Sequence, residues 1–132
     1  MNRFLSLVAL VLALAFPSAA LATTGTGTSP GLTVTVSLIP DTAANGDTVT
    51  ATESVTNTSG TKQNVVVSTV LRDPTGATVT RTTRVVLKPS ATFNKTATYV
   101  VDPADPRGTY TLSVTAGGQS GTAVASAQVT YV

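Results

Sequence analysis

Few residues of this chain are suited to chemistry, and two of the usual types are missing. The 132 residues include no histidine and no cysteine. Composition therefore excludes Ser–His–Asp triads, Cys–His dyads and zinc sites built from these ligands. The enzymatic option left is a pair of carboxylates, as in glycoside hydrolysis.

Asp102 and Asp105 are close in sequence, and each precedes a proline. That arrangement is typical of turns, in which the carboxylate accepts hydrogen bonds from backbone N–H groups. With Asp41 or Asp47 they would supply oxygens for calcium, but the spacing matches no acidic calcium loop. We therefore expect no catalytic residue, no metal and no cofactor, and a protein that is not an enzyme.

The N-terminus has the pattern of a secretory signal peptide over residues 1–22. Arg3 gives a cationic start, an apolar run covers residues 4–16, and Ala20-Leu21-Ala22 forms a small-x-small cleavage site. The alternative, a membrane-spanning helix, needs about 20 apolar residues. We therefore expect a secreted or periplasmic protein that leaves the membrane after cleavage.

The charge balance bears on possible partners. Eight lysines and arginines stand against six aspartates and glutamates, with no basic run. This composition gives no electrostatic case for a nucleic-acid partner. We expect a protein or cell-envelope partner instead.

Apolar and polar residues alternate with a period of two along residues 108–116, as a half-buried strand requires. Tyr110, Leu112 and Val114 fall on one side. The same pattern predicts seven strands, at 32–38, 48–56, 65–72, 77–88, 92–101, 108–116 and a last strand that ends at 132. Residues 23–31, TTGTGTSPG, have the composition of a flexible leader. The predicted fold is thus one seven-stranded antiparallel β-sandwich over residues 32–132.

Asp105, Gly108, Tyr110 and Leu112 are spaced as in the tyrosine corner of immunoglobulin-type sandwiches, which this stretch resembles. The resemblance implies that the Tyr110 hydroxyl bonds to backbone upstream of it. Leu112 stands where antibody domains place a disulfide cysteine, so the chain would be a disulfide-free relative with an immunoglobulin-like fold.

A wider resemblance covers residues 49–60, the turn Asp73-Pro74-Thr75-Gly76 and residues 108–112. These stretches are similar to the bacterial CARDB and fibronectin-III-like modules, which implies an exported or cell-surface module for protein binding. The C-terminal residues 118–131 are also similar, more faintly, to the terminal strand of chaperone–usher pilins.

Glu53 and Lys95 both fall in the apolar phase of their predicted strands. In the topology that the resemblance implies, these two strands are neighbours in one sheet. A lone charge on the inner face is costly. We therefore expect the two side chains to form a structural pair there, the alternative being a bulge that turns Glu53 outward.

The function expected from the sequence is that of a non-enzymatic interaction or structural module acting through loops or an edge strand. Residues 79–84 are the expected edge, although charges on an edge also prevent aggregation. The alternatives are a small secreted hydrolase inhibitor presenting residues 102–107, and a pilin-like fibre subunit with an open hydrophobic groove. The candidate partner-facing residues are Arg81, Arg84, Asp102, Asp105 and Arg107.

Overall fold

The computed structural model describes residues 21–132, so most of the expected signal peptide lies outside the described residues. The described chain forms nine β-strands: β1 (Thr23–Ser29), β2 (Leu32–Ile39), β3 (Thr42–Ala43), β4 (Thr48–Asn57), β5 (Gln63–Arg72), β6 (Thr78–Leu87), β7 (Thr92–Val100), β8 (Gly108–Gly117) and β9 (Thr122–Tyr131). No helix long and apolar enough to cross a membrane occurs in this part of the chain.

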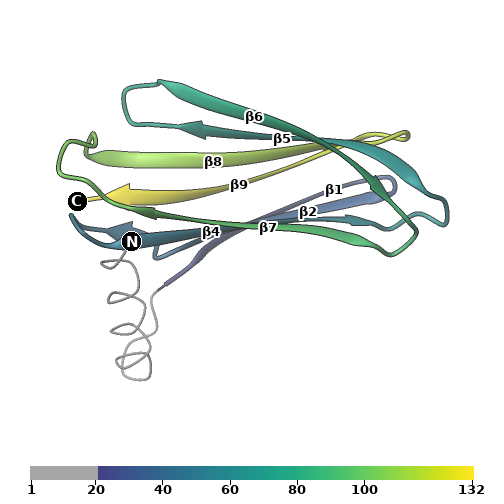
Figure 1. Cartoon of the computed structure of the whole chain (residues 1–132), viewed down its shortest axis with the longest axis horizontal. Helices are drawn as coiled ribbons and strands as arrows, with labels where there is room; N and C mark the ends of the chain where they lie inside the picture. The colour runs from purple at the N-terminus through teal and green to yellow at the C-terminus, as the bar shows by residue number, and fades with distance from the viewer. Residues whose placement is uncertain (1–20) are drawn as a thin grey trace.

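The strands form two stacked sheets (Figure 1). One sheet has the order β1-β2-β4-β7, and the other has the order β3-β9-β8-β5-β6. All neighbouring strands are antiparallel except β3 and β9, which are parallel. The fold is therefore an all-β sandwich of four and five strands.

All seven expected strands are present, as β2 and β4 to β9, but the expected total of seven was wrong. The short β3 adds one strand, and β1 adds the other. The structure thus corrects the prediction of a flexible leader at 23–31, because β1 pairs with β2 along its whole length, from Thr23 opposite Leu38 to Ser29 opposite Leu32.

Glycine in β1 serves close packing rather than flexibility. A Cβ atom added to Gly25 would lie 1.9 Å from the carbonyl oxygen of Ser126, and one added to Gly27 would lie 1.8 Å from that of Val124. Both oxygens belong to β9, in the other sheet. The Thr23 hydroxyl also donates to the carbonyl of Gln128, at 2.6 Å. Backbone of β1 therefore packs directly on β9 and closes one side of the sandwich.

The core lies between the sheets and is aliphatic. Leu112 and Val114, predicted to lie on one side of their strand with Tyr110, are buried, and Tyr110 is partly buried. Alternate residues of β2 are buried as well. The same holds for the alternating small residues of β9. The largest fully buried apolar side chains are Leu32, Val34, Val36, Val55, Val65, Val67 and Val114.

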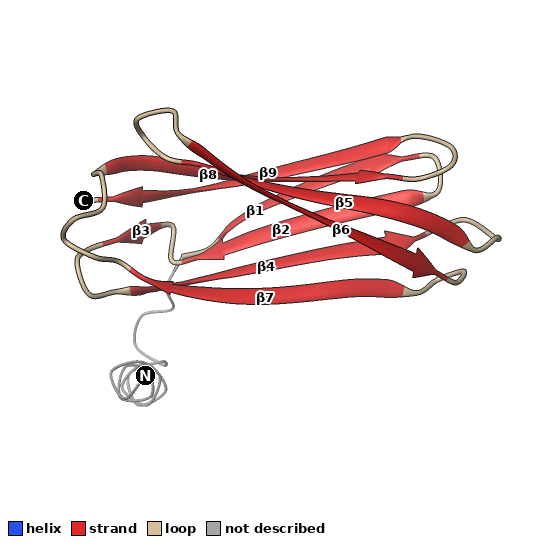
Figure 2. Ribbon diagram, turned by 45° about the horizontal axis from the view of Figure 1, so that its top comes forward, coloured by secondary structure: helices blue, strands red, loops and turns tan. Residues whose placement is uncertain are grey.

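The opposite side of the sandwich is formed by β6 and β7, which are the outer strands of their sheets. A short turn at residues 88–91 connects them, and from there the two strands diverge (Figure 2). Near the turn, Leu87 is buried and Phe93 packs against the core. Farther along, nearly every residue of both strands is exposed. The sandwich is therefore closed at one half of this side and open at the other.

Replacing Gly27 with alanine should destabilise the fold, because the new methyl group would overlap backbone of β9. We expect a loss of about 3 kcal/mol in the free energy of unfolding, measured with urea. Gly60→Ala is the control, since Gly60 has open space around it and no positive φ. Equal stability of the two variants would contradict the close contact between β1 and β9.

Candidate functional site

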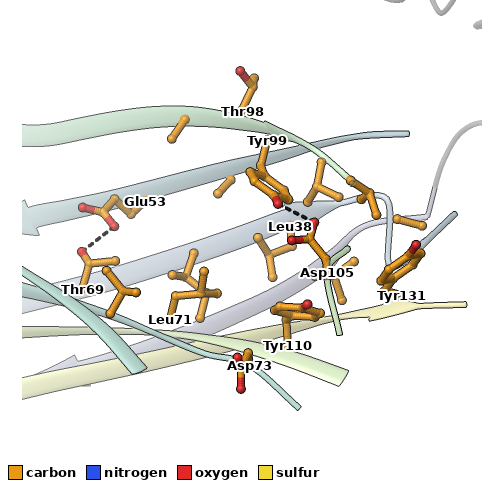
Figure 3. Close-up of a pocket in the computed structure, with 18 of the residues that line it drawn as sticks. Leu38, Glu53, Thr69, Leu71, Asp73, Thr98, Tyr99, Asp105, Tyr110 and Tyr131 are labelled. Carbon is orange, nitrogen blue, oxygen red and sulfur yellow. Dashed lines mark hydrogen bonds between the residues drawn. The ribbon is translucent and has the colours of Figure 1, made fainter. Parts of the chain in front are cut away.

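A cleft of about 630 Å³ enters the sandwich where β6 and β7 diverge (Figure 3). Its walls come from both sheets and are mainly apolar, with side chains of Leu38, Val49, Ala51, Leu71, Val79, Ala97, Tyr99, Tyr110, Leu112 and Val129. Small-molecule sites in proteins typically measure about 300–1,000 Å³ and have such apolar walls with a few polar groups. We therefore treat this cleft as the candidate site.

Four polar residues mark the inner boundary of the cleft, and we call them the polar rung: Arg81, Thr69, Glu53 and Lys95. Arg81 is the register partner of Thr69 in one sheet, and Glu53 is the partner of Lys95 in the other. The Thr69 hydroxyl donates to the Glu53 carboxylate across the sandwich, at 2.8 Å. The polar rung therefore runs across both sheets at one level.

Glu53 and Lys95 were expected to form a pair. They are opposite each other in the strand register, but Glu53 is hydrogen-bonded to another residue. The two residues are directly opposite in neighbouring strands, as expected. Glu53 is buried, only 7% exposed, and its hydrogen bond comes from Thr69, whereas Lys95 is exposed. Sequence reasoning missed Thr69 because strand alternation does not tell which residue of the opposite sheet faces a given side chain.

The other end of the cleft holds two tyrosines with engaged hydroxyls. Tyr99 donates to the carboxylate of Asp105. This hydrogen bond, together with burial and the charge of Asp105, raises the pKa of Tyr99 to about 12. Tyr110 donates to the carbonyl of Pro106, at 2.7 Å, and burial followed by the charges of Asp105 and Asp73 raises the pKa of Tyr110. Both rings thus present apolar surface to the cleft.

The bond from Tyr110 to Pro106 is the backward contact that the resemblance to a tyrosine corner implies. Leu112, two residues on, is buried in the core next to this corner. Tyr110 thus ties the loop before β8 to the sandwich, and Leu112 belongs to the core.

The loop at residues 102–107 is held by its own hydrogen bonds. Asp102 accepts from the N–H of Ala104 at 2.8 Å, and Asp105 accepts from the N–H of Asp102 at 2.9 Å. Arg107 lies over the ring of Tyr131, 5.1 Å from its centroid. The two aspartates therefore act as turn acceptors in this loop.

The carboxylates considered for calcium do not gather. Asp47 accepts from the N–H of Ala44, at 2.8 Å, in a separate turn. Within residues 21–132, no group of three or more acidic, histidine or cysteine residues is placed to hold a metal ion.

The strand expected at an edge, β6, is the outer strand of the five-stranded sheet. Because side chains alternate along a strand, its two arginines point to opposite faces. Arg81 lines the cleft, whereas Arg84 does not. The structure thus separates two residues that the sequence had grouped.

Neither a protein-family model nor a curated protein sequence matches this chain. The solved structures similar to it include an alkylpurine DNA glycosylase of Pseudomonas fluorescens, with a TM-score of 0.54 and 14% identity over 98% of this chain. A β-glucosidase of Listeria innocua has a TM-score of 0.52 and 17% identity over 76% of the chain. A β-glucosidase of Erythrobacter marinus has a TM-score of 0.51 and 18% identity over 84%.

This chain corresponds to only part of each of those proteins: 35% of the glycosylase and 16% of either β-glucosidase. Similarity at such low identity concerns the fold alone. The comparisons therefore show a two-sheet β-sandwich domain and no particular family.

Thr69→Val should destabilise the protein, because it keeps the shape of the side chain but removes the donor to Glu53. A buried acceptor left without a partner costs about 1–3 kcal/mol. Urea unfolding measures the loss, and Thr80→Val, on the exposed face of β6, is the control. If the two variants lose equal stability, the hydrogen bond to Glu53 is not what stabilises this level of the sandwich.

Asp105→Asn should lower the pKa of Tyr99 from about 12 towards its ordinary value of 10.0. Because folding raises this pKa, the stabilisation is complete below about pH 10 and is lost as the pH rises towards 12. NMR of ring-labelled tyrosine follows the titration, with Asp41→Asn as control. An unchanged Tyr99 titration in Asp105→Asn would refute the pairing.

Proposed function

We propose that this protein is a non-enzymatic binding module whose ligand, a small apolar molecule, lies in the cleft between the sheets. The observation that carries the proposal is the apolar cleft of about 630 Å³ at the open half of the sandwich. The sequence led us to expect action through loops or an edge strand. We propose instead that the ligand binds in the cleft bordered by the two edge strands, β6 and β7.

Apolar side chains around the cleft stay in contact with water. Val79 is 60% exposed, Tyr99 is 54% exposed and Leu71 is 39% exposed. Covering apolar surface is favourable by roughly 25 cal/mol per Å². Monomers keep large apolar patches mostly at functional sites. A ligand that fills the cleft would supply this burial.

The shape and the charges of the site favour a small molecule over a peptide strand. The cleft ends at the polar rung on one side and at the loop 102–107 on the other. Both bordering strands carry exposed cations, Arg81 and Arg84 on β6 and Lys95 on β7. Such charges on edge strands oppose the addition of another strand.

The second candidate is a protein partner that adds a strand to β6 or β7, as in a pilin-like fibre. It is favoured by one observation, that both strands end their sheets beside an open apolar groove. The hydrolase-inhibitor alternative lacks such support, because it needs residues 102–107 to project as an extended loop, and this loop is bonded to itself and to Tyr99.

For the finer classification, we propose an immunoglobulin-like module of the CARDB or fibronectin-III-like group, exported to the periplasm or the exterior. The two-sheet architecture and the bond from Tyr110 to Pro106 support the group. The sequence pattern of residues 1–22 supports export. The strand β1 is an addition to the seven strands expected for such a module.

Binding of an uncharged apolar dye, phenylnaphthylamine, tests the proposed function. We expect the dye to become fluorescent on the native protein and Ala97→Phe to weaken its binding at least about tenfold, because the ring fills the cleft. Thr96→Phe is the matched control, since Thr96 is the preceding residue of β7 and does not line the cleft. Failure of the native protein to bind the dye, or equal binding by both variants, would contradict the proposal.

A further inference from the structure

We infer that the ligand is a single-chain amphiphile with an anionic head group, held between Arg81 and Lys95, and an alkyl chain directed towards Tyr99 and Tyr110. This inference rests on the proposed function, because it names the chemistry of the molecule that would fill the same cleft. It follows from which polar groups of the cleft are already bonded within the protein.

Arg81 and Lys95 both line the cleft at the level of the polar rung, one on each of the two strands that border it. Arg81 is one strand outward from Thr69, and Lys95 is one strand outward from Glu53. The bond from Thr69 to Glu53 fixes the two sheets at this level. Stacked sheets are about 10 Å apart, so two long side chains from opposite sheets can reach one anion between them.

The carboxylates that line the cleft are bonded within the protein. Glu53 accepts from Thr69, and Asp105 accepts from Tyr99 and from the N–H of Asp102. Asp73 accepts from the Thr75 hydroxyl and from the N–H groups of Thr75 and Ala77, and these turn bonds, that of the hydroxyl first, lower its pKa. At the polar rung Glu53 is only 7% exposed, whereas Arg81 and Lys95 are exposed, so the two cations are the charged groups there that a ligand can reach from solvent.

The opposite end of the cleft suits an alkyl chain. The hydroxyls of Tyr99 and Tyr110 are turned to Asp105 and to the carbonyl of Pro106. Their rings, with Leu71, then form an apolar wall (Figure 3), and Val129 also lines the cleft. A head group at the polar rung therefore places the chain of an amphiphile along the apolar part of the cleft.

The cations have a competing explanation, the protection of two free strand edges against aggregation. Arg84 separates the two roles, because it lies on the same edge strand as Arg81 but outside the cleft. A purely protective charge would behave alike at both positions, whereas a head-group contact requires Arg81 specifically.

The test is calorimetric titration with decanoate, decanol and decyltrimethylammonium, all as monomers at pH 8. We expect decanoate to bind about tenfold more tightly than decanol, with about a threefold loss in Arg81→Gln or Lys95→Gln and about a tenfold loss in the double variant. Arg84→Gln should bind like the native protein. The preference for decanoate should also decrease with added salt.

The outcomes separate the two proposals. Equal affinity for decanoate and decanol, unchanged in Arg81→Gln and Lys95→Gln, overturns the anionic head group but leaves the apolar site intact. Preference for the cationic amphiphile overturns it as well. Binding to phosphatidylglycerol vesicles without binding of monomeric decanoate points to a membrane surface and overturns it too. If no probe binds and the apolar dye also fails, the proposed function itself falls.

Discussion

The contact on which this sandwich depends is the packing of β1 backbone directly on β9. Gly25 and Gly27 leave no room for a Cβ atom, so the two sheets approach more closely on this side than side chains would permit. On the other side, β6 and β7 meet only near the turn that connects them. The side formed by β1 and β9 is thus closed because the glycines of β1 have no side chains to hold the sheets apart. The side formed by β6 and β7 is open along half its length.

The bond between Glu53 and Thr69 lies where the closed half gives way to the open half. Beyond Glu53 on β4, Val55 is fully buried, whereas before it Ala51 lines the cleft. A buried carboxylate is costly unless it is hydrogen-bonded. The same polar pair therefore satisfies a structural need and sets the inner limit of the candidate site.

Rigidity at the far end of the cleft comes from the loop before β8. Tyr99 and Tyr110 hold this loop through Asp105 and Pro106, and Arg107 packs on the ring of Tyr131. A cleft with fixed ends needs little reorganisation when a ligand enters, which favours binding. The chain thus combines an open apolar space with a preformed frame.

The sequence alone determined the seven main strands, because strand alternation is a local property. The topology implied by the resemblance placed Glu53 and Lys95 on neighbouring strands, and the structure has them opposite each other, with Glu53 hydrogen-bonded to Thr69 instead. The sequence did not predict β1, because a stretch of threonine and glycine has the composition of a flexible leader. The two glycines become part of a strand only because their backbone packs on β9. Nor did the sequence predict the cleft or Thr69 as the partner of Glu53. A period of two tells which face of a strand turns inward. The distance between two sheets, and which residues meet across it, are decided only when both sheets are packed.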